Sequence, residues 1–228
     1  METAIANNSN TKIIWQQIQS LLNTINHVLI GLVGIYTTLL AKSLNFQDTA
    51  LHMFLTIIGI HVSVAEALMS HYPYNPLTNR LSHRNKCRYH AVLQIIGGSM
   101  ALLGALGKIR STEVHFTTWH GKMGLSAAFM CFSSLCGGFL NYFQPKFIHK
   151  IYTKSEVKYR HNFFGMITFT LGIATIFLGY LTQFFSKYFN ENVISAFMLA
   201  TALMYLITII APLQSFRNKL KYRKKFFN

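Results

Sequence analysis

Six stretches of about twenty mainly apolar residues restrict this chain to an integral membrane fold, because a helix that crosses a bilayer needs that length. They lie at residues 21–41, 51–70, 91–109, 121–140, 163–185 and 193–213. Only 12% of the 228 residues are charged, about half the share found in soluble domains. The charges avoid the apolar stretches, and the connections are short. The sequence therefore predicts an all-α membrane protein with six transmembrane helices.

The basic residues predict how these helices are oriented. Sixteen Lys and Arg residues fall on one side of the predicted topology: Lys12, Arg80, Arg84, Lys86, Arg88, Lys146, Lys150, Lys154, Lys158, Arg160, Arg217, Lys219, Lys221, Arg223, Lys224 and Lys225. The other side holds four, Lys42, Lys108, Arg110 and Lys187. Cytoplasmic loops carry the excess of Lys and Arg, so both termini are expected in the cytoplasm, which agrees with an even number of spans. The net charge of +15 then reports topology rather than a nucleic-acid surface.

One domain accounts for nearly the whole chain. We expect a cytoplasmic N-terminal segment at residues 1–19, a six-helix transmembrane domain at 20–214 and a basic cytoplasmic tail at 215–228. A cleavable signal pattern is not evident, since the first apolar run is long enough to span. Cys87, Cys131 and Cys136 form neither CxxC nor CxxCH, so covalent haem, a zinc knuckle and a disulfide framework are not indicated.

Four histidines stand near the starts of four consecutive apolar stretches: His52, His90, His120 and His161. In the predicted topology, His52 and His120 lie near the outer face, whereas His90 and His161 lie near the cytoplasmic face. Each pair therefore joins two different helices at one depth. Haem iron is often held by histidine, and helix bundles build cofactor sites from side chains on facing helices. The pattern predicts a central bundle of helices two to five that holds two non-covalent haems b, each between two imidazoles.

Glycines recur on the faces that carry these histidines. Gly97 and Gly104 lie within about 40° of the histidine direction on their helix, at 100° per residue. Gly138 and Gly179 each follow the histidine of their own helix by eighteen residues, which is five turns. Each helix then offers a ligand at one depth and a notch for a flat macrocycle at the other. The alternative is that these glycines only allow close helix packing.

Other polar residues within or near the spans leave several roles open. His61 should lie opposite His52 on its helix, as a packed or hydrogen-bonded residue. His27 is either a satisfied core histidine or a contact to a haem propionate. Glu66 is expected near the cytoplasmic haem, where it either handles a proton or makes a structural hydrogen bond, since intramembrane charges are costly. Lys122 either extends to the interface or meets a propionate.

The segments around these histidines resemble the cytochrome b561 family, specifically its short members that are little more than the six-helix core. The matching stretches are LHMFLTIIGIHVSVAEAL, RYHAVLQ, HFTTWHGKMGL and KYRHNFFG. The likeness covers about residues 20–225. Met53 departs from the pattern, because the family has proline after the second-helix histidine.

This resemblance implies a transmembrane carrier of electrons with two haems b, whose axial ligands are His52 with His120 and His90 with His161. Cytoplasmic ascorbate is the implied donor, and monodehydroascorbate or ferric chelates are the implied acceptors beyond the membrane.

The resemblance also suggests substrate residues. Of the three positions where the family places basic residues for ascorbate, only Lys154 is basic here, because the other two hold His83 and Cys87. Nearby cations that could replace the missing charges are Arg84, Lys86, Arg88, Lys158 and Arg160. The outer-side position of the family's substrate histidine holds Lys108, and His115 is a candidate substitute.

The basic cluster supports this interpretation independently, because it would attract an anionic donor such as ascorbate. The alternative is that these charges only fix topology and meet anionic lipid.

Two further membrane functions were weighed. A haem-free ion or metal transporter could use the intramembrane histidines and Glu66. A membrane di-iron desaturase expects clustered HxxHH-type boxes, which this sequence lacks. A homodimer stays open, as does the choice between an endomembrane or vesicle location (endoplasmic reticulum, secretory or endocytic) and the plasma membrane.

Overall fold

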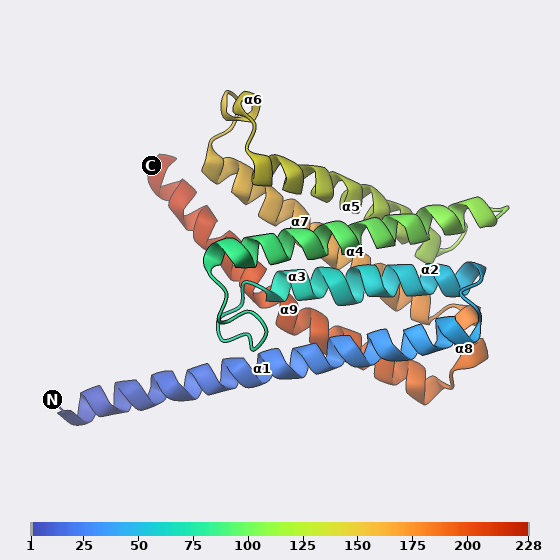
Figure 1. The fold of residues 1–228 in the computed structure, drawn as a ribbon, viewed down its shortest axis with the longest axis horizontal. Coiled ribbons are helices and arrows are strands. Elements are labelled where there is room, and N and C mark those ends of the chain that lie inside the picture. Colours follow the sequence, from blue (N-terminus) through green and yellow to red (C-terminus); the bar gives the residue numbers. More distant parts are fainter. Residues whose placement is uncertain (1, 228) are drawn as a thin grey trace.

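The computed structural model is built from helices throughout the described part of the chain (Figure 1). It describes the backbone of residues 2–227 and the side chains of residues 11–146, 148 and 150–220. The side chains of Lys221, Arg223, Lys224 and Lys225, predicted at the cytoplasmic face, lie outside this range. Among the described residues, six helices are long and apolar enough to cross a membrane. The predicted all-α, six-span fold is confirmed.

The second span is divided into three helical segments, whereas the other spans are single helices. The elements are α1 (Glu2–Ser43), α2 (Asp48–Thr56), η1 (Ile57–Val64), α3 (Ala65–Met69), α4 (His83–Ser111), α5 (Trp119–Phe143), α6 (Lys146–His149), α7 (Lys154–Tyr180), α8 (Gln183–Tyr188) and α9 (Glu191–Phe227). Helix α2 begins five residues before Met53, so the missing proline does not alter the start of this span. α1 and α9 continue through residues 19–20 and 214–215, and the proposed domain bounds there stay a prediction.

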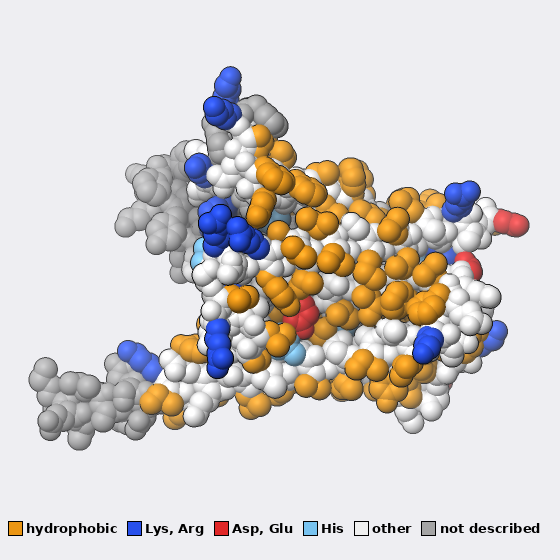
Figure 2. Space-filling view, viewed as in Figure 1, with side chains coloured by type: hydrophobic (Ala, Val, Ile, Leu, Met, Phe, Trp, Pro, Cys, Tyr) orange, Lys and Arg blue, Asp and Glu red, His pale blue; other side chains and the backbone are white. Residues whose placement is uncertain are grey.

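The spans are arranged in antiparallel pairs. α5 packs on α7, α4 packs on the second span, and α1 and α9 lie against each other along one side of the molecule (Figure 1). α9 also packs on α7, and α4 on α5. Large apolar side chains such as Leu32, Leu103 and Phe129 point outward, as they do where the surface meets lipid rather than water. Lys and Arg side chains gather instead at the two ends of the bundle (Figure 2).

The second span and α4 touch backbone to backbone. A Cβ atom built on Gly59 would lie 2.6 Å from the Gly97 carbonyl oxygen, and one built on Gly97 would lie 2.6 Å from the Gly59 carbonyl oxygen. Any side chain here would force the helices apart, which explains the small residues. Gly59 lies within the π-helical segment η1, where the Ser63 hydroxyl donates to the Ile58 carbonyl five residues back (2.8 Å). π-helical turns are frequently found at functional sites.

A proline in α9 is compensated by a tyrosine from the loop after α3. Pro212 has no N–H, so the Thr208 carbonyl four residues earlier loses its intrahelical donor. The Tyr72 hydroxyl donates to that carbonyl at 2.8 Å and accepts from the Ala211 N–H at 2.9 Å. Burial raises the pKa of Tyr72 to about 12, so the hydroxyl stays protonated at physiological pH. This contact fixes α9 against the second span.

Candidate functional site

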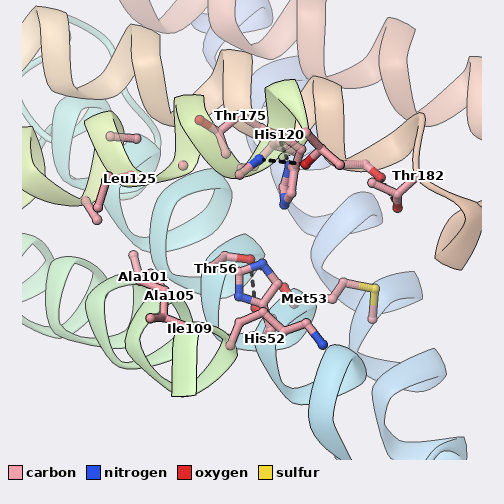
Figure 3. A pocket seen from close by; sticks show the side chains of 18 of the residues that line it. His52, Met53, Thr56, Ala101, Ala105, Ile109, His120, Leu125, Thr175 and Thr182 are labelled. Carbon is pink, nitrogen blue, oxygen red and sulfur yellow. Dashed lines mark hydrogen bonds between the residues drawn. The ribbon is translucent and has the colours of Figure 1, made fainter. Parts of the chain in front are cut away.

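The outer histidine pair joins α2 and α5. The imidazole centroids of His52 and His120 lie 6.0 Å apart, with ring planes at 82° (Figure 3). His52 Nδ1 lies 2.9 Å from the Gly104 carbonyl oxygen, and His120 Nδ1 lies 3.0 Å from the Thr175 carbonyl oxygen. Because a carbonyl only accepts, each Nδ1 carries the proton and each Nε2 keeps its lone pair. The pair therefore offers two neutral nitrogen donors.

The inner pair repeats this arrangement on α4 and α7. The centroids of His90 and His161 are 6.3 Å apart, and their planes meet at 88°. His90 Nδ1 donates to the Ala67 carbonyl oxygen at 2.9 Å. His161 Nδ1 is also buried, but it has no hydrogen-bond partner. Three of the four histidines thus have a backbone acceptor, and one does not.

These separations suit a metal held between two imidazoles. A bond from imidazole nitrogen to a first-row metal is about 2 Å long, so opposed nitrogens lie about 4 Å apart and their ring centroids about 6 Å apart. The outer pair borders a cavity of about 420 Å³, lined mainly by apolar side chains such as Met53, Ile57 and Leu102. All four histidines therefore fit a bis-imidazole cofactor in donor type and spacing, and three of them also in tautomer.

The predicted glycine notches separate into two kinds. A Cβ atom on Gly179 would lie 3.3 Å from His120 Cε1, and one on Gly138 would lie 3.4 Å from His161 Cε1. Each of these glycines thus leaves room for the imidazole of the partner helix. Gly97 and Gly104 instead both pack on the second span, as the alternative interpretation expected, and the Gly104 carbonyl also receives the His52 hydrogen bond.

At the end of the bundle near His52 and His120, which we call the outer mouth, Lys108 forms an ion pair with Asp48. Its Nζ lies 2.8 Å from Asp48 Oδ2 and 2.8 Å from the Thr49 hydroxyl, and Ser111 donates to the second Asp48 oxygen at 2.6 Å. His115 is exposed and both it and Lys108 line the outer cavity. The structure thus brings both predicted outer residues to the cavity, and Asp48 partly compensates the Lys108 charge.

Basic side chains from three helices lie at the end of the bundle near His90 and His161, which we call the inner mouth. Arg84, Lys86 and Arg88 lie in the first two turns of α4, and Lys154 and Lys158 in the first two turns of α7. Figure 2 shows basic side chains gathered at this end of the bundle.

A lysine from α9, which the sequence assigned only to the tail, joins this group. Lys219 Nζ lies 3.4 Å from the carbonyl oxygen of Lys158, three residues before His161. Arg160, by contrast, pairs with Glu156 at 3.3 Å and stacks on Tyr152 at 4.4 Å, so its charge is already compensated.

Glu66 and His27 form a half-buried pair between the second span and α1. Glu66 Oε1 lies 2.7 Å from His27 Nδ1, and Asn75 Oδ1 lies 3.3 Å from His27 Nε2. The Asn75 oxygen also accepts from the Leu77 N–H, so it is an acceptor toward His27 and Nε2 carries a proton. The remaining contact then needs one more proton, either on His27 Nδ1 or on Glu66. The pair therefore shares one additional proton, whether that proton is on His27 or on Glu66.

The other intramembrane candidates stay apart from the two histidine pairs. His61 is fully buried within η1. Lys122 lies over the Trp119 ring at 5.3 Å from its centroid, near the start of α5. Among the described side chains, no three His, Cys, Asp or Glu residues come together as a metal site.

Comparison with known proteins agrees with this geometry. Residues 51–187, which include all four histidines, match the family model described as eukaryotic cytochrome b561. The chain belongs to the cytochrome b561 family. It is 28% identical over 178 residues to the transmembrane reductase CYB561D2 of Bos taurus, a match that covers 76% of this chain and 78% of that protein. The proteins of the same name from Mus musculus and Homo sapiens match with the same identity and coverage. No solved structure matches.

Membership fixes the general class of this protein. It is a multi-pass membrane protein of the b-type cytochrome class, and its activity is that of an oxidoreductase. The family is a haem-binding one, in agreement with a histidine-lined bundle. The number of haems, their ligands and the substrates are matters for proposal.

Proposed function

We propose that this protein carries electrons from cytoplasmic ascorbate through two haems b to monodehydroascorbate or a ferric chelate on the other side of the membrane. The observation that carries the proposal is the presence of two facing imidazole pairs on different helices of the bundle. His52 with His120 would hold the outer haem, and His90 with His161 the inner one. When bound, each haem supplies one-electron chemistry, whereas the protein supplies ligation and surroundings.

The histidine surroundings support this role. Hydrogen bonds to backbone carbonyls hold three imidazoles in the tautomer that leaves Nε2 free for iron, and such outer-shell bonds increase the basicity of a ligand. The glycines beside His120 and His161 leave space next to each ring. The four side chains are thus held ready for a ligand.

The inner mouth has the electrostatics that an anionic donor requires. Arg84, Lys86, Arg88, Lys154 and Lys158 are proposed to attract ascorbate, and Lys219 adds a further charge beside His161. A cluster of one sign at a cleft raises the local concentration of its counter-ion and speeds encounter. At the outer mouth, Lys108 and His115 are proposed to meet the acceptor. Because Asp48 pairs with Lys108, the outer mouth is less positive than the inner one.

Glu66 is proposed to hold an exchangeable proton together with His27, close to the inner histidine pair. Its neighbour Ala67 accepts the His90 hydrogen bond. A proton at this position would offset the charge of an electron received nearby. The same pair also ties α1 to the second span.

The basic residues at the inner mouth are the basis for orienting the protein in its membrane. We propose that the inner mouth and both termini face the cytoplasm, in an endomembrane or vesicle membrane or in the plasma membrane. A second copy of the chain as a stable partner is left open.

A haem-free ion or metal transporter is the other candidate, and the half-buried His27–Glu66 pair within the spans is the observation that favours it. One experiment separates the two. Full-length protein is purified, its haem content is measured, and it is placed in vesicles loaded with ascorbate in the presence of an external ferric chelate. We expect about two haems per chain and reduction of the external chelate. Purified, folded protein without haem would refute the electron-transfer proposal.

A further inference from the structure

The inner pair contains two buried polar atoms without hydrogen-bond partners, one a donor and one an acceptor. His161 Nδ1 is assigned as the donor, because the proposed ligation uses Nε2, as at the other three histidines. Asn141 Oδ1 on α5 is the acceptor. Buried polar atoms in proteins are nearly always hydrogen-bonded, so each unpaired atom calls for a physical explanation.

Helix α5 places Asn141 one turn beyond the glycine that lies against the His161 ring. Gly138 lies directly against the His161 ring, since its Cβ position is 3.4 Å from Cε1 and 4.0 Å from Nδ1. Asn141 follows Gly138 by three residues, and residues three apart lie on the same helix face, about 5–6 Å apart at Cβ. The Asn141 side chain therefore projects next to the edge of the ring that bears Nδ1.

The outer pair provides an internal comparison, because the α5–α7 contact is repeated there with the two helices exchanged. His120 lies against Gly179 as His161 lies against Gly138. The residue three positions beyond Gly179 is Thr182, which lines the outer cavity beside His120 (Figure 3). Helix α7 ends at Tyr180, so Thr182 occupies the corresponding place in the chain just beyond the helix, whereas Asn141 lies within α5.

The two ends differ in how that position is used. At the outer end, the carbonyl four residues before the glycine, that of Thr175, accepts from His120. Thr182 is not needed for this bond, and its hydroxyl donates to its own helix at Gly179 (2.7 Å). At the inner end, the corresponding carbonyl belongs to Ser134, and His161 makes no bond to it. His161 is then left with the Asn141 amide oxygen as the unpaired acceptor next to it.

We propose that Asn141 is a positioning residue for the inner haem, and that its amide oxygen accepts the Nδ1–H hydrogen bond of His161. This inference rests on the proposed ligand role of His161. It gives the inner site a side-chain acceptor in place of the backbone acceptor that the other three histidines have. A side chain can rotate, so this ligand is held less firmly and its basicity depends on one replaceable residue.

The test uses full-length, haem-loaded protein and three variants, Asn141→Leu, Asn141→Gln and Asn141→Asp. When Asn141 accepts a hydrogen bond from Nδ1–H, the imidazole becomes a more basic ligand. A more basic ligand stabilises ferric iron and lowers the reduction potential of the haem. We therefore expect the inner-haem potential to rise in the leucine variant, to stay near the parent value in the glutamine variant and to fall in the aspartate variant. The low-temperature electron paramagnetic resonance signal of the inner ferric haem should move with it, whereas the outer signal should not. Ser133→Ala is the control, because Ser133 is only half-buried on α5 and its hydroxyl is bonded within its own helix.

The outcomes separate cleanly. The inference would be overturned if the inner-haem potential shifted in the same direction in the leucine and aspartate variants, or in neither. Loss of packing alone would affect both variants alike, whereas a hydrogen-bond role predicts opposite effects for a missing acceptor and a stronger one. If the leucine variant fails to retain inner haem, the lower inner-haem potential expected of the aspartate variant relative to the glutamine variant still decides the matter. Parent protein that binds no haem would refute the proposed function instead. Two haems in every variant with unchanged potentials would refute only the role of Asn141.

Discussion

Helices α5 and α7 each carry a proposed haem ligand near one end and a glycine near the other. Replacing the glycine of one helix should remove the haem that the histidine of the other helix would hold. Gly179 on α7 faces the His120 ring of α5, and Gly138 on α5 faces the His161 ring of α7. Gly179→Val is therefore expected to empty the outer site, and Gly138→Val the inner site. Gly137→Val is the control, since a Cβ there meets nothing within 4 Å.

The size of the effect follows from the contacts. A Cβ atom would lie 3.3 Å from His120 Cε1 or 3.4 Å from His161 Cε1, a separation that already forces the ring to move by a few tenths of an ångström. Valine adds two methyl groups about 1.5 Å beyond Cβ, toward or beside the ring. Overpacking of this kind costs about 1–3 kcal/mol. If the cost falls on the ligated state, haem affinity at that site drops about 5- to 150-fold.

The assay measures haem per chain together with a redox titration that resolves two components. His52→Ala and His90→Ala identify the components by removing the outer and the inner haem, respectively. Gly179→Val should then resemble His52→Ala, and Gly138→Val should resemble His90→Ala. If Gly179→Val depleted the inner haem, the pairing of histidines and the crosswise packing of α5 on α7 would both be wrong.

Three further predictions concern the groups around the two sites. Tyr72→Phe leaves the carbonyl freed by the α9 proline without a donor, so we expect a loss of about 1–3 kcal/mol in stability, measured as a lower thermal midpoint in detergent. Glu66→Gln keeps a hydrogen-bond partner for His27 but removes the titratable group; the thermal midpoint should stay near the parent value while the inner-haem potential becomes less dependent on pH, and an unchanged pH dependence would contradict the proton role. Asp48→Asn removes the partner of Lys108, so we expect faster reduction of an anionic ferric chelate at the outer side, with a steeper dependence on salt; a slower rate would show that the ion pair serves to hold the outer mouth in place.

The sequence predicted the parts of this protein that depend on periodicity within one helix. The six spans, and the glycines five turns from a histidine, follow from 3.6 residues per turn and from the length needed to cross a bilayer. The predicted notches at Gly138 and Gly179 lie against histidines in the structure, although each faces the ligand of its neighbour helix. The sequence could not show which histidine ring would lie against each of these glycines, because helical phase alone does not fix which neighbouring helix a face contacts.

The contacts that the sequence missed join residues far apart in the chain. Asp48 meets Lys108 sixty residues later, and Lys219 reaches the Lys158 carbonyl from sixty-one residues away. Asn141 was not considered because an asparagine near the end of an apolar stretch is equally typical of a helix terminus. A buried acceptor becomes informative only when the unpaired donor beside it is known, and that requires the packing of α5 on α7.

The two ends of the bundle use the same ligands, so their differences must arise outside the histidine pairs. Both pairs have nearly equal ring separations and nearly perpendicular planes, which leaves little asymmetry in the ligands themselves. At the inner end, cations from α4, α7 and α9 surround the site, and Lys219 has no carboxylate among its described contacts. At the outer end, Asp48 pairs with the lysine that lines the cavity. Under the proposed function, we expect an anionic donor to concentrate at the inner end, so that the direction of electron flow depends on where the donor binds rather than on how the iron is held.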